Sequence, residues 1–525
     1  MRERGPHGGP GCSVLRVENA SVYDRIVADT GPDGRLPADF DLDPPGDLGG
    51  LPFAPGAWDA LFGTRNKDGA TVNEVVSLIA RYAIREDADA LQRLGGLLAA
   101  HHTIDLVDAV LDSLRADHRG IMPGDLITAA HRLATTSADI EVVKLAIALF
   151  GLFDLGTAAP IRDVVATLAR YDDFTLYAVV ATQRWTGGND LRFGMARSAR
   201  GWGKIRAVER LEPSTDEIRD WILREGCANG ILDAYLGLVC ATKGDLIGVL
   251  RRPELDADLF EAAGVIMEAM TDEGPAEGLS AYEHAGEALR CYLRHAAGHA
   301  RTVTDLARVI ALRQWAEEAE TDDTPDIVAL CRGIMDAPGW EPVILAAIRA
   351  GGPERYRAIR AARVLGLDVA ATLMDAIRQD PLAYAYAALG LMDDPARAAR
   401  LAGLYETVLP LEAIGCGMGT DVFAADHRQE NQALEFVMQG LGAYPGTGRR
   451  LVVAGLRSPV IRARYLACRV LARWCDVLGR PLAAWAPDLA DEVRRIRRTE
   501  VDADTRQFMR RLLDRTSGPW TPETD

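Results

Sequence analysis

The sequence predicts an all-α protein in which short amphipathic helices follow one another through tight corners. Apolar residues make up 48% of the 525 residues and aromatic residues only 6%, a composition that favours helices over sheets. From about residue 60, apolar residues recur at the three- and four-residue spacing of a helix face. No run of alternating apolar and polar residues, which a strand would require, interrupts these stretches.

The first 59 residues differ from the rest of the chain. They are rich in Gly and Pro, which disfavour long helices. We therefore predict that residues 1–59 form an irregular N-terminal segment, with a short strand at "SVLRV" and a helical turn at "SVYDRIVAD". The helical region follows over residues 60–515, and residues 516–525 are expected to be a flexible tail.

Several amphipathic stretches define the first half of the helical region. They are, in order, "TVNEVVSLIARYAIR", "TIDLVDAVLDSLRADH", "IEVVKLAIALFGLF" and "FTLYAVVATQRW". Each presents an apolar face that a single helix cannot cover, so neighbouring helices must pack against it.

Residues 201–227, "GWGKIRAVERLEPSTDEIRDWILREGC", predict one complete unit of helix, corner and helix. Trp202 lies on the apolar stripe of the first helix and Trp221 on that of the second, so both are expected to be packing residues. Ser214 is predicted to cap the second helix, and Glu217, three residues later, would complete a capping box.

The stretch "SPVIRARYLACRVLARWC" near the C-terminus predicts a helix that is covered on two sides. Ser458 is the expected N-cap, and Pro459 fits the first helical turn. Apolar residues occupy most of its circumference, as in an inner helix of a stack.

This stretch and "GWGKIRAVERL" resemble the second helices of HEAT and armadillo-type repeats, and the likeness extends over residues 60–515. The resemblance implies a right-handed α-solenoid, in which each helix pair is stabilised by its neighbours. It further implies a non-catalytic scaffold or adaptor that binds a protein partner on the concave surface of the superhelix.

Residues 177–241 are similar to a group of bacterial proteins often labelled limonene hydroxylase. This second resemblance implies an alternative function, an enzyme of the monooxygenase type. A third alternative is a HEAT-like nucleic-acid-binding protein. The formal net charge of −17 argues against that alternative, because such a surface repels phosphate backbones.

Motifs that would identify a catalytic centre are missing. The sequence contains no GxxxxGK[ST], HExxH or GxSxG, and "GCGMGT" does not match the dinucleotide-binding pattern GxGxxG. We therefore predict no catalytic or cofactor-binding residues. Glu287, Cys291, His295 and His299 share a helix face at metal-ligand spacing, but a role at the helix end is favoured over a metal site.

The expected location is the cytoplasm. The N-terminus has no apolar core of a signal peptide, and no apolar run reaches the ~20 residues that cross a bilayer. The eight cysteines form no CxxC pair, which indicates reduced thiols rather than a zinc ribbon.

Two groups of polar residues off the apolar stripes are candidates for contact with a protein partner. One group follows Trp202 and the other lies on a single face of the helix near the C-terminus. The candidates are Lys204, Arg206, Glu209, Arg210, Arg462, Arg469 and Arg473.

Overall fold

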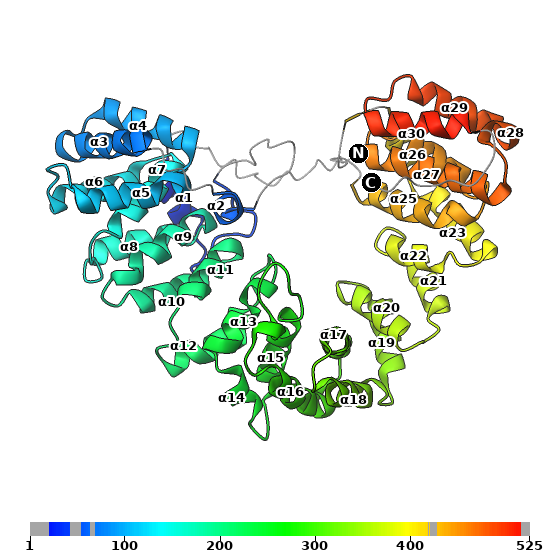
Figure 1. The fold of residues 1–525 in the computed structure, drawn as a ribbon, viewed down its shortest axis with the longest axis horizontal. Coiled ribbons are helices and arrows are strands. Elements are labelled where there is room, and N and C mark those ends of the chain that lie inside the picture. Colours follow the sequence, from blue (N-terminus) through cyan, green and yellow to red (C-terminus); the bar gives the residue numbers. More distant parts are fainter. Residues whose placement is uncertain (1–19, 43–53, 64–68, 418, 421–427, 516–525) are drawn as a thin grey trace, which may run out of the picture. The chain divides into compact units, whose positions relative to one another are not determined.

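A computed structural model describes residues 20–42, 54–63, 69–417, 419–420 and 428–515. Within these ranges every regular element is a helix, which confirms the all-α prediction (Figure 1). No helix of this described part combines the length and hydropathy that would let it cross a membrane. The predicted strand at residues 13–17 and the predicted tail at 516–525 lie outside the described ranges.

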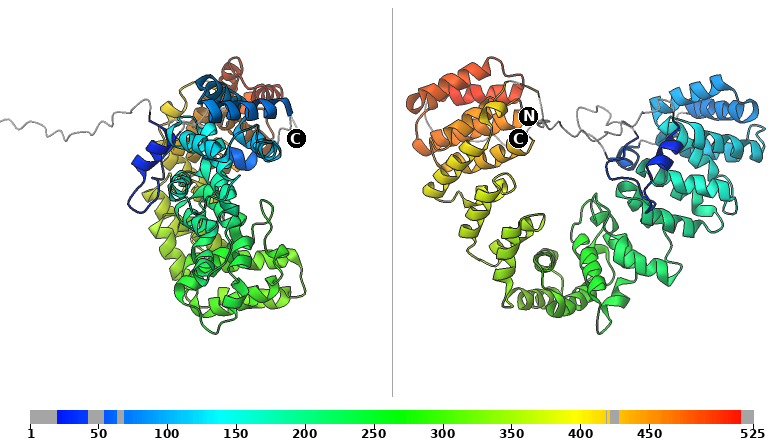
Figure 2. Two further views of the ribbon diagram at one scale, coloured as in Figure 1. Left: turned by 90° about the vertical axis from the view of Figure 1, so that its left-hand side faces the viewer. Right: turned by 180° about the vertical axis from the view of Figure 1, so that it is seen from behind.

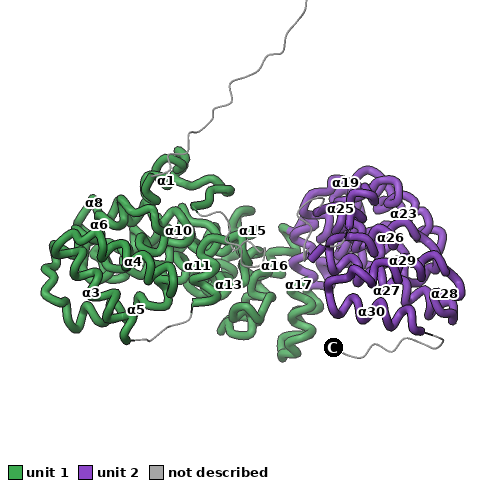
Figure 3. Tube along the Cα trace, turned by 90° about the horizontal axis from the view of Figure 1, so that it is seen from above, with its two compact units in different colours: residues 1–299, 311–330 green, residues 300–310, 331–525 purple. Residues whose placement is uncertain are grey.

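The chain divides into two compact units (Figure 3). Unit 1 comprises residues 1–299 and 311–330, and unit 2 comprises residues 300–310 and 331–525. Two helices contribute residues to both units, α17 (Val303–Ala319) and α18 (Thr324–Met335).

Unit 1 begins with two short helices of the N-terminal segment, α1 (Val22–Asp29) and α2 (Ala57–Leu61). The regular helices that follow are α3 (Gly69–Arg85), α4 (Ala88–His101), α5 (Thr103–Ala116), α6 (Pro123–Thr136), α7 (Ile140–Phe150), α8 (Ala159–Leu168), α9 (Asp172–Ala181), α10 (Gly188–Ser198), α11 (Gly201–Arg210), α12 (Asp216–Trp221), α13 (Ala234–Lys243), α14 (Leu246–Leu250), α15 (Ala257–Ala269) and α16 (Ala285–His299).

The helices of unit 1 pack mainly against near neighbours in the sequence. In one row, α7 contacts α9, α9 contacts α11, α11 contacts α13, and α13 contacts α15. In a second row, α6 contacts α8 and α8 contacts α10. The fully buried side chains of Phe150 and Phe174 belong to the first row. This order follows from the amphipathic pattern, because each helix covers the apolar face of the next.

The corner between α11 and α12 shows that the predicted N-cap of α12 was wrong. Thr215, not Ser214, is the N-cap of α12, and its hydroxyl accepts the Ile218 N–H at 3.2 Å. Ser214 Oγ instead accepts a hydrogen bond from Asn189 of α10 at 2.9 Å. The predicted capping box therefore does not form, because Glu217 occupies the second helical position rather than the third.

Trp202 and Trp221 are both buried, as predicted. The Trp202 ring packs on Tyr235 of α13 at 5.2 Å between centroids, and the Trp221 ring meets Phe193 of α10 at 5.5 Å. After Trp221 the chain continues as one turn of π-helix over Ile222–Gly226.

Unit 2 contains a second succession of short helices. They are α19 (Trp340–Ala350), α20 (Glu354–Val364), α21 (Ala370–Gln379), α22 (Ala385–Leu391), α23 (Pro395–Val408), α24 (Leu411–Ile414), α25 (Arg428–Gly440), α26 (Arg449–Leu456), α27 (Ile461–Leu478), α28 (Leu482–Trp485), α29 (Pro487–Arg497) and α30 (Ala503–Asp514).

Helix α27 is the central helix of unit 2, in contact with α25, α26 and α30. Its Trp474 is fully buried, and the indole N–H donates to the Leu441 carbonyl at 2.7 Å. The predicted start of this helix needs correction, because α27 begins at Ile461 with Val460 as N-cap. Ser458 Oγ accepts the Val460 N–H and so bonds to the chain before the helix.

A candidate arginine-lined pocket over a buried ion cluster

A buried lysine organises the part of unit 1 where α2, α7 and α9 meet. Lys144 follows two valines on α7, and its side chain is only 4% exposed. Its ammonium nitrogen lies 2.9 Å from Asp59 Oδ2 and 2.8 Å from Glu141 Oε1. Asp173 Oδ1 is 3.6 Å away. One cation is thus surrounded by three carboxylates, which we call the ion cluster.

Neighbouring groups hold each carboxylate of the ion cluster in place. The Tyr177 hydroxyl donates to Asp59 Oδ2 at 3.0 Å. The backbone N–H of Thr103, at the start of α5, donates to Glu141, and the Gly56 N–H donates to Asp173 Oδ1 at 3.1 Å. Short α2 is therefore fixed to α7 and α9, and α5 to α7, through charge-assisted hydrogen bonds.

Burial and charge act in opposite directions on these groups. Burial would lower the pKa of Lys144, but attraction to the three carboxylates outweighs it and raises the pKa. Burial raises the pKa of Asp59 and of Asp173, although the lysine opposes this. Burial would also raise the pKa of Glu141, yet Lys144 and the Thr103 hydrogen bonds lower it. The lysine therefore stays charged, and burial opposes its attraction at each of the three carboxyl groups.

One oxygen of the ion cluster has no partner. Asp59 Oδ1 is buried and accepts no hydrogen bond from any described residue. Asp59 and Tyr177 both border a pocket of about 410 Å³ on unit 1. A buried acceptor without a donor costs free energy, so this oxygen favours a donor such as a backbone N–H of an occupant, and it disfavours a second carboxylate directly beside it.

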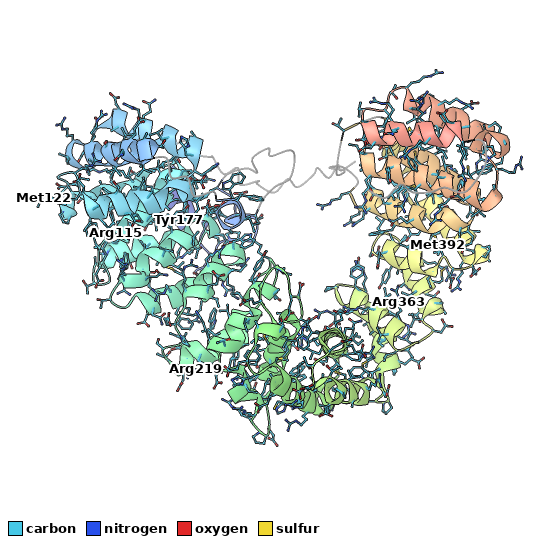
Figure 4. The ribbon with its side chains drawn as sticks, in the orientation of Figure 1. Arg115, Met122, Tyr177, Arg219, Arg363 and Met392 are labelled. Carbon is cyan, nitrogen blue, oxygen red and sulfur yellow. The ribbon has the colours of Figure 1, made fainter. Side chains whose placement is uncertain are left out.

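The pocket combines an apolar wall with a set of arginines. Val107 and Leu111 of α5 and Val180 of α9 form part of the wall. Figure 4 labels Arg115 and Tyr177, which border the pocket from α5 and α9. The lining arginines come from α5, from the turn after α9 and from α11, and they are Arg115, Arg184, Arg206 and Arg210.

Two of these arginines share one carboxylate. Glu209 Oε2 lies 3.0 Å from Arg206 Nη1 and 3.2 Å from Arg210 Nη1. Arg206 Nε is buried and has no hydrogen-bond partner in the described part of the chain. Arg184 is exposed and forms no ion pair with any described carboxylate. The lining also includes Asp59 and Asp108, and Arg115 pairs with Asp112 at 2.8 Å, so Arg184 is the lining arginine without an ion pair among the described residues.

The N-terminus of α11, which carries Arg206 and Arg210, is fixed by a carboxylate of α9. The backbone N–H groups of Arg200 and Gly203 lie near Asp172 and act to lower its pKa. A β-carbon at Gly203 would lie 2.6 Å from Asp172 Oδ1, and one at Gly201 would lie 2.4 Å from Oδ2. The "GWG" sequence thus lets the helix end approach the carboxylate closely.

Burial raises the pKa of Asp172 to about 7, even though the two backbone N–H groups oppose this. The carboxyl group therefore titrates in the neutral range, next to the helix that carries the arginines.

The structure separates the predicted contact residues on α11. Arg206, Glu209 and Arg210 lie together at the pocket, as described above. Lys204 instead donates to the carbonyls of Glu225 at 2.7 Å and Ala228 at 2.6 Å, and its ammonium lies over the Trp221 ring. Burial lowers the pKa of Lys204. This lysine bonds the end of the π-helical turn and does not border the pocket.

The predicted arginines of α27 belong to unit 2. Arg462, Arg469 and Arg473 are exposed, and Arg462 Nε lies 3.2 Å from Glu435 Oε2. The same helix carries a buried arginine that sequence reasoning did not select. Arg464 is fully buried and pairs with Glu500 through two contacts of 2.7 Å.

The predicted metal alternative is not assembled. His295 Nε2 lies 3.0 Å from the Leu250 carbonyl oxygen, and the His299 ring stacks on Phe260. Glu287 pairs with Arg251 at 2.7 Å. Among the residues that the structure describes, no group of three or more His, Cys, Asp or Glu side chains is placed to hold a metal ion.

Sequence reasoning missed the ion cluster. One signal was available, because Lys144 interrupts the otherwise apolar run of "IEVVKLAIALF". A lone charge among buried residues requires a charged partner. The identity of the partners could not be found, since Asp59 and Asp173 are distant in the sequence.

The chain matches no protein-family model, and no curated protein matches it significantly. The resemblances to HEAT and armadillo-type repeats and to the proteins labelled limonene hydroxylase therefore remain predictions from the sequence.

Proposed function

We propose that this protein is a non-catalytic helical-repeat scaffold whose unit 1 binds an acidic segment of a protein partner. The proposal includes a right-handed α-solenoid of the HEAT/armadillo type with the partner on its concave surface. Packing of each helix mainly against near neighbours, seen in both rows of unit 1, supports this architecture.

The arginine-lined pocket is the observation that carries the proposal. Guanidinium groups bind carboxylates through paired hydrogen bonds, and Arg184 is available for such a bond. Val107, Leu111 and Val180 offer an adjacent apolar surface. The occupant that fits both is an acidic side chain next to an apolar one, in an extended or helical peptide.

Peptide binding by the full-length protein tests this proposal. The probe is a fluorescently labelled peptide of alternating Glu and Leu. A peptide of the same length with alternating Lys and Leu is the control. We expect the acidic peptide to bind, and Arg184→Gln to weaken its binding about two- to fivefold and to reduce its salt dependence, because an exposed charge contact is lost.

Arg219→Gln is the matched control. Arg219 belongs to α12, is 42% exposed and pairs with Asp216, and it does not border the pocket. Its replacement should leave peptide binding unchanged. Equal binding by the Arg184→Gln and wild-type proteins, or equal binding of the Lys and Leu peptide, would refute the proposal.

The monooxygenase alternative predicts a different outcome. An enzyme of that type would convert limonene when supplied with its reductant and oxygen, independently of the acidic peptide. Turnover of limonene by the wild-type protein, without binding of the acidic peptide, would refute the scaffold proposal and support the monooxygenase alternative.

A further inference from the structure

A second arginine-lined hollow lies on unit 1, between the N-terminal segment, α8 and α10. Its volume is about 600 Å³, and it shares no lining residue with the pocket described above. We call it the N-terminal hollow. Its four arginines are Arg35, Arg162, Arg170 and Arg197.

The wall of the N-terminal hollow that comes from residues 20–42 is firmly attached to the helices. Helix α1 packs against α6 and α8, and the Val22 N–H donates to the Ser137 carbonyl at 2.9 Å. In Figure 3, α1 lies on the side of unit 1 that carries α6, α8 and α10, and Figure 2 shows the same segment in blue. Farther along, the Tyr171 hydroxyl donates to Asp41 at 2.9 Å. Arg35 is therefore held opposite the arginines of the helices.

Neutral groups orient three of the four guanidinium groups. Arg35 Nη2 donates to the Arg197 carbonyl at 2.7 Å, and Arg170 Nη1 donates to Thr30 Oγ1 at 3.2 Å. The Arg197 guanidinium lies 5.6 Å from the centre of the Phe193 ring. These contacts orient the guanidinium groups without neutralising their charge.

None of the four arginines of the N-terminal hollow lies within 4.0 Å of a described carboxylate, so none forms an ion pair there. Arginines elsewhere in unit 1 do form such pairs. Arg224, for example, contacts both Asp220 and Asp256. The lining also contains Asp33 and Asp190, so four positive charges face two negative ones. An anion with at least two charges would balance the hollow.

We propose that the N-terminal hollow binds a pyrophosphate group, either as the inorganic ion or as the phosphate end of a nucleoside diphosphate. A pyrophosphate offers acceptor oxygens in several directions, which suits guanidinium forks that approach from different elements. The protein as a whole has a net charge of −17, so a place where arginines outnumber carboxylates stands out as a site for such an anion.

Isothermal titration calorimetry of the full-length protein in phosphate-free buffer tests this proposal. The probes are sodium pyrophosphate, ADP and, as a carboxylate of comparable charge, citrate. We expect pyrophosphate to bind more tightly than citrate, with an affinity that falls as salt rises. Tighter binding of ADP than of pyrophosphate would assign the site to a nucleotide, and equal binding would assign it to the phosphate group alone.

Two variants address the hollow, Arg162→Gln and Arg197→Gln, and each should weaken pyrophosphate binding at least about tenfold. Arg162→Lys keeps the charge without the fork and should give an intermediate affinity. Arg219→Gln, at a residue that borders neither pocket, should bind like the wild type.

Thermal melting separates binding from folding. Without pyrophosphate, Arg162→Gln and Arg197→Gln should melt at or above the wild-type temperature, because they remove unpaired like charges. Pyrophosphate should raise the melting temperature of the wild type only. The proposal is overturned if pyrophosphate does not bind, if citrate binds equally well, if either Gln variant binds like the wild type, or if these variants melt far below it.

Discussion

Asp172 is the residue on which the geometry of α11 most directly depends. It joins the N-terminus of α11 to α9, and the two glycines on either side of Trp202 make room for its carboxylate. The pocket arginines Arg206 and Arg210 are placed by this contact, because they follow on the same helix.

The space at Gly203 leads to a first prediction. A β-carbon there would lie 2.6 Å from both Asp172 Oδ1 and Thr175 Oγ1, and Thr175 is fully buried. We expect Gly203→Ala to lower the free energy of unfolding by about 1–3 kcal/mol through overpacking. Urea unfolding followed by tryptophan fluorescence measures this change.

Gly96→Ala is the matched control for that measurement. Gly96 also lies inside a helix of unit 1, and a β-carbon there would meet no atom within 4 Å. The control should gain about 0.5–1 kcal/mol, because alanine favours the helix. Equal effects of the two substitutions would show that space at Gly203 is not limiting.

The pKa of Asp172 leads to a prediction on pH. Its folded value of about 7 exceeds the ordinary value of 3.8, so the folded state binds the proton more tightly. The stabilisation from this group is complete below pH ~4 and is lost as pH rises through about 7. The loss is at most about 1.4 kcal/mol per pH unit.

Comparison with Asp172→Asn isolates the contribution of Asp172 to the pH dependence of stability, because the other groups titrate alike in both proteins. The free energy of unfolding of the wild type minus that of the variant should fall between pH 4 and 7. A difference that is constant or rises over this range would contradict the assigned pKa.

At the scale of elements, Arg464 fixes α27 to the segments around it. Besides the pair with Glu500 before α30, Nη1 donates to the carbonyls of Ser458 and Pro459 at 2.9 Å. Nη2 donates to the Gly419 carbonyl at 3.1 Å, within the "GCGMGT" stretch. Gly419 packs on Pro459, where a β-carbon would lie 2.9 Å from its ring. Gly419 thus allows close packing against the residues that precede α27.

Arg464→Met should therefore destabilise unit 2 by about 3–5 kcal/mol, because Glu500 would remain buried without its partner. Urea unfolding gives the value. The double variant Arg464→Met with Glu500→Leu should recover part of the loss. As a control, Arg494→Gln breaks an exposed pair with Asp491 and should cost less than about 1 kcal/mol. Similar losses for both arginines would mean that burial of the pair does not matter.

For the whole molecule, division into two compact units predicts that a substitution that destabilises one unit leaves the stability of the other unchanged. Hydrogen exchange measured by mass spectrometry should show faster exchange in α9, α11 and α13 of Gly203→Ala. Exchange in α25, α27 and α30 should remain as in the wild type, because these helices belong to unit 2. A uniform increase over both units would indicate that the chain unfolds as one cooperative body.

The sequence by itself determined the helical class and the burial of Trp202 and Trp221, because helix periodicity is a local property of the chain. It also contained a signal that was not used, because Lys144 lies in an otherwise apolar run. It placed the cap of α12 one residue early, since serine is in isolation a somewhat better N-cap than threonine. The Ser214 hydroxyl instead accepts a hydrogen bond from Asn189, which belongs to α10.

Only the tertiary structure decided which distant residues meet. It brought Asp59, Glu141 and Asp173 around Lys144, and it placed the arginines of α5, the turn after α9 and α11 around one pocket. It also assigned Lys204 to a helix end and Arg206 to that pocket, although they are two residues apart. The physical reason is that charge pairing and pocket formation depend on distances across helices, which the periodicity of single helices does not encode.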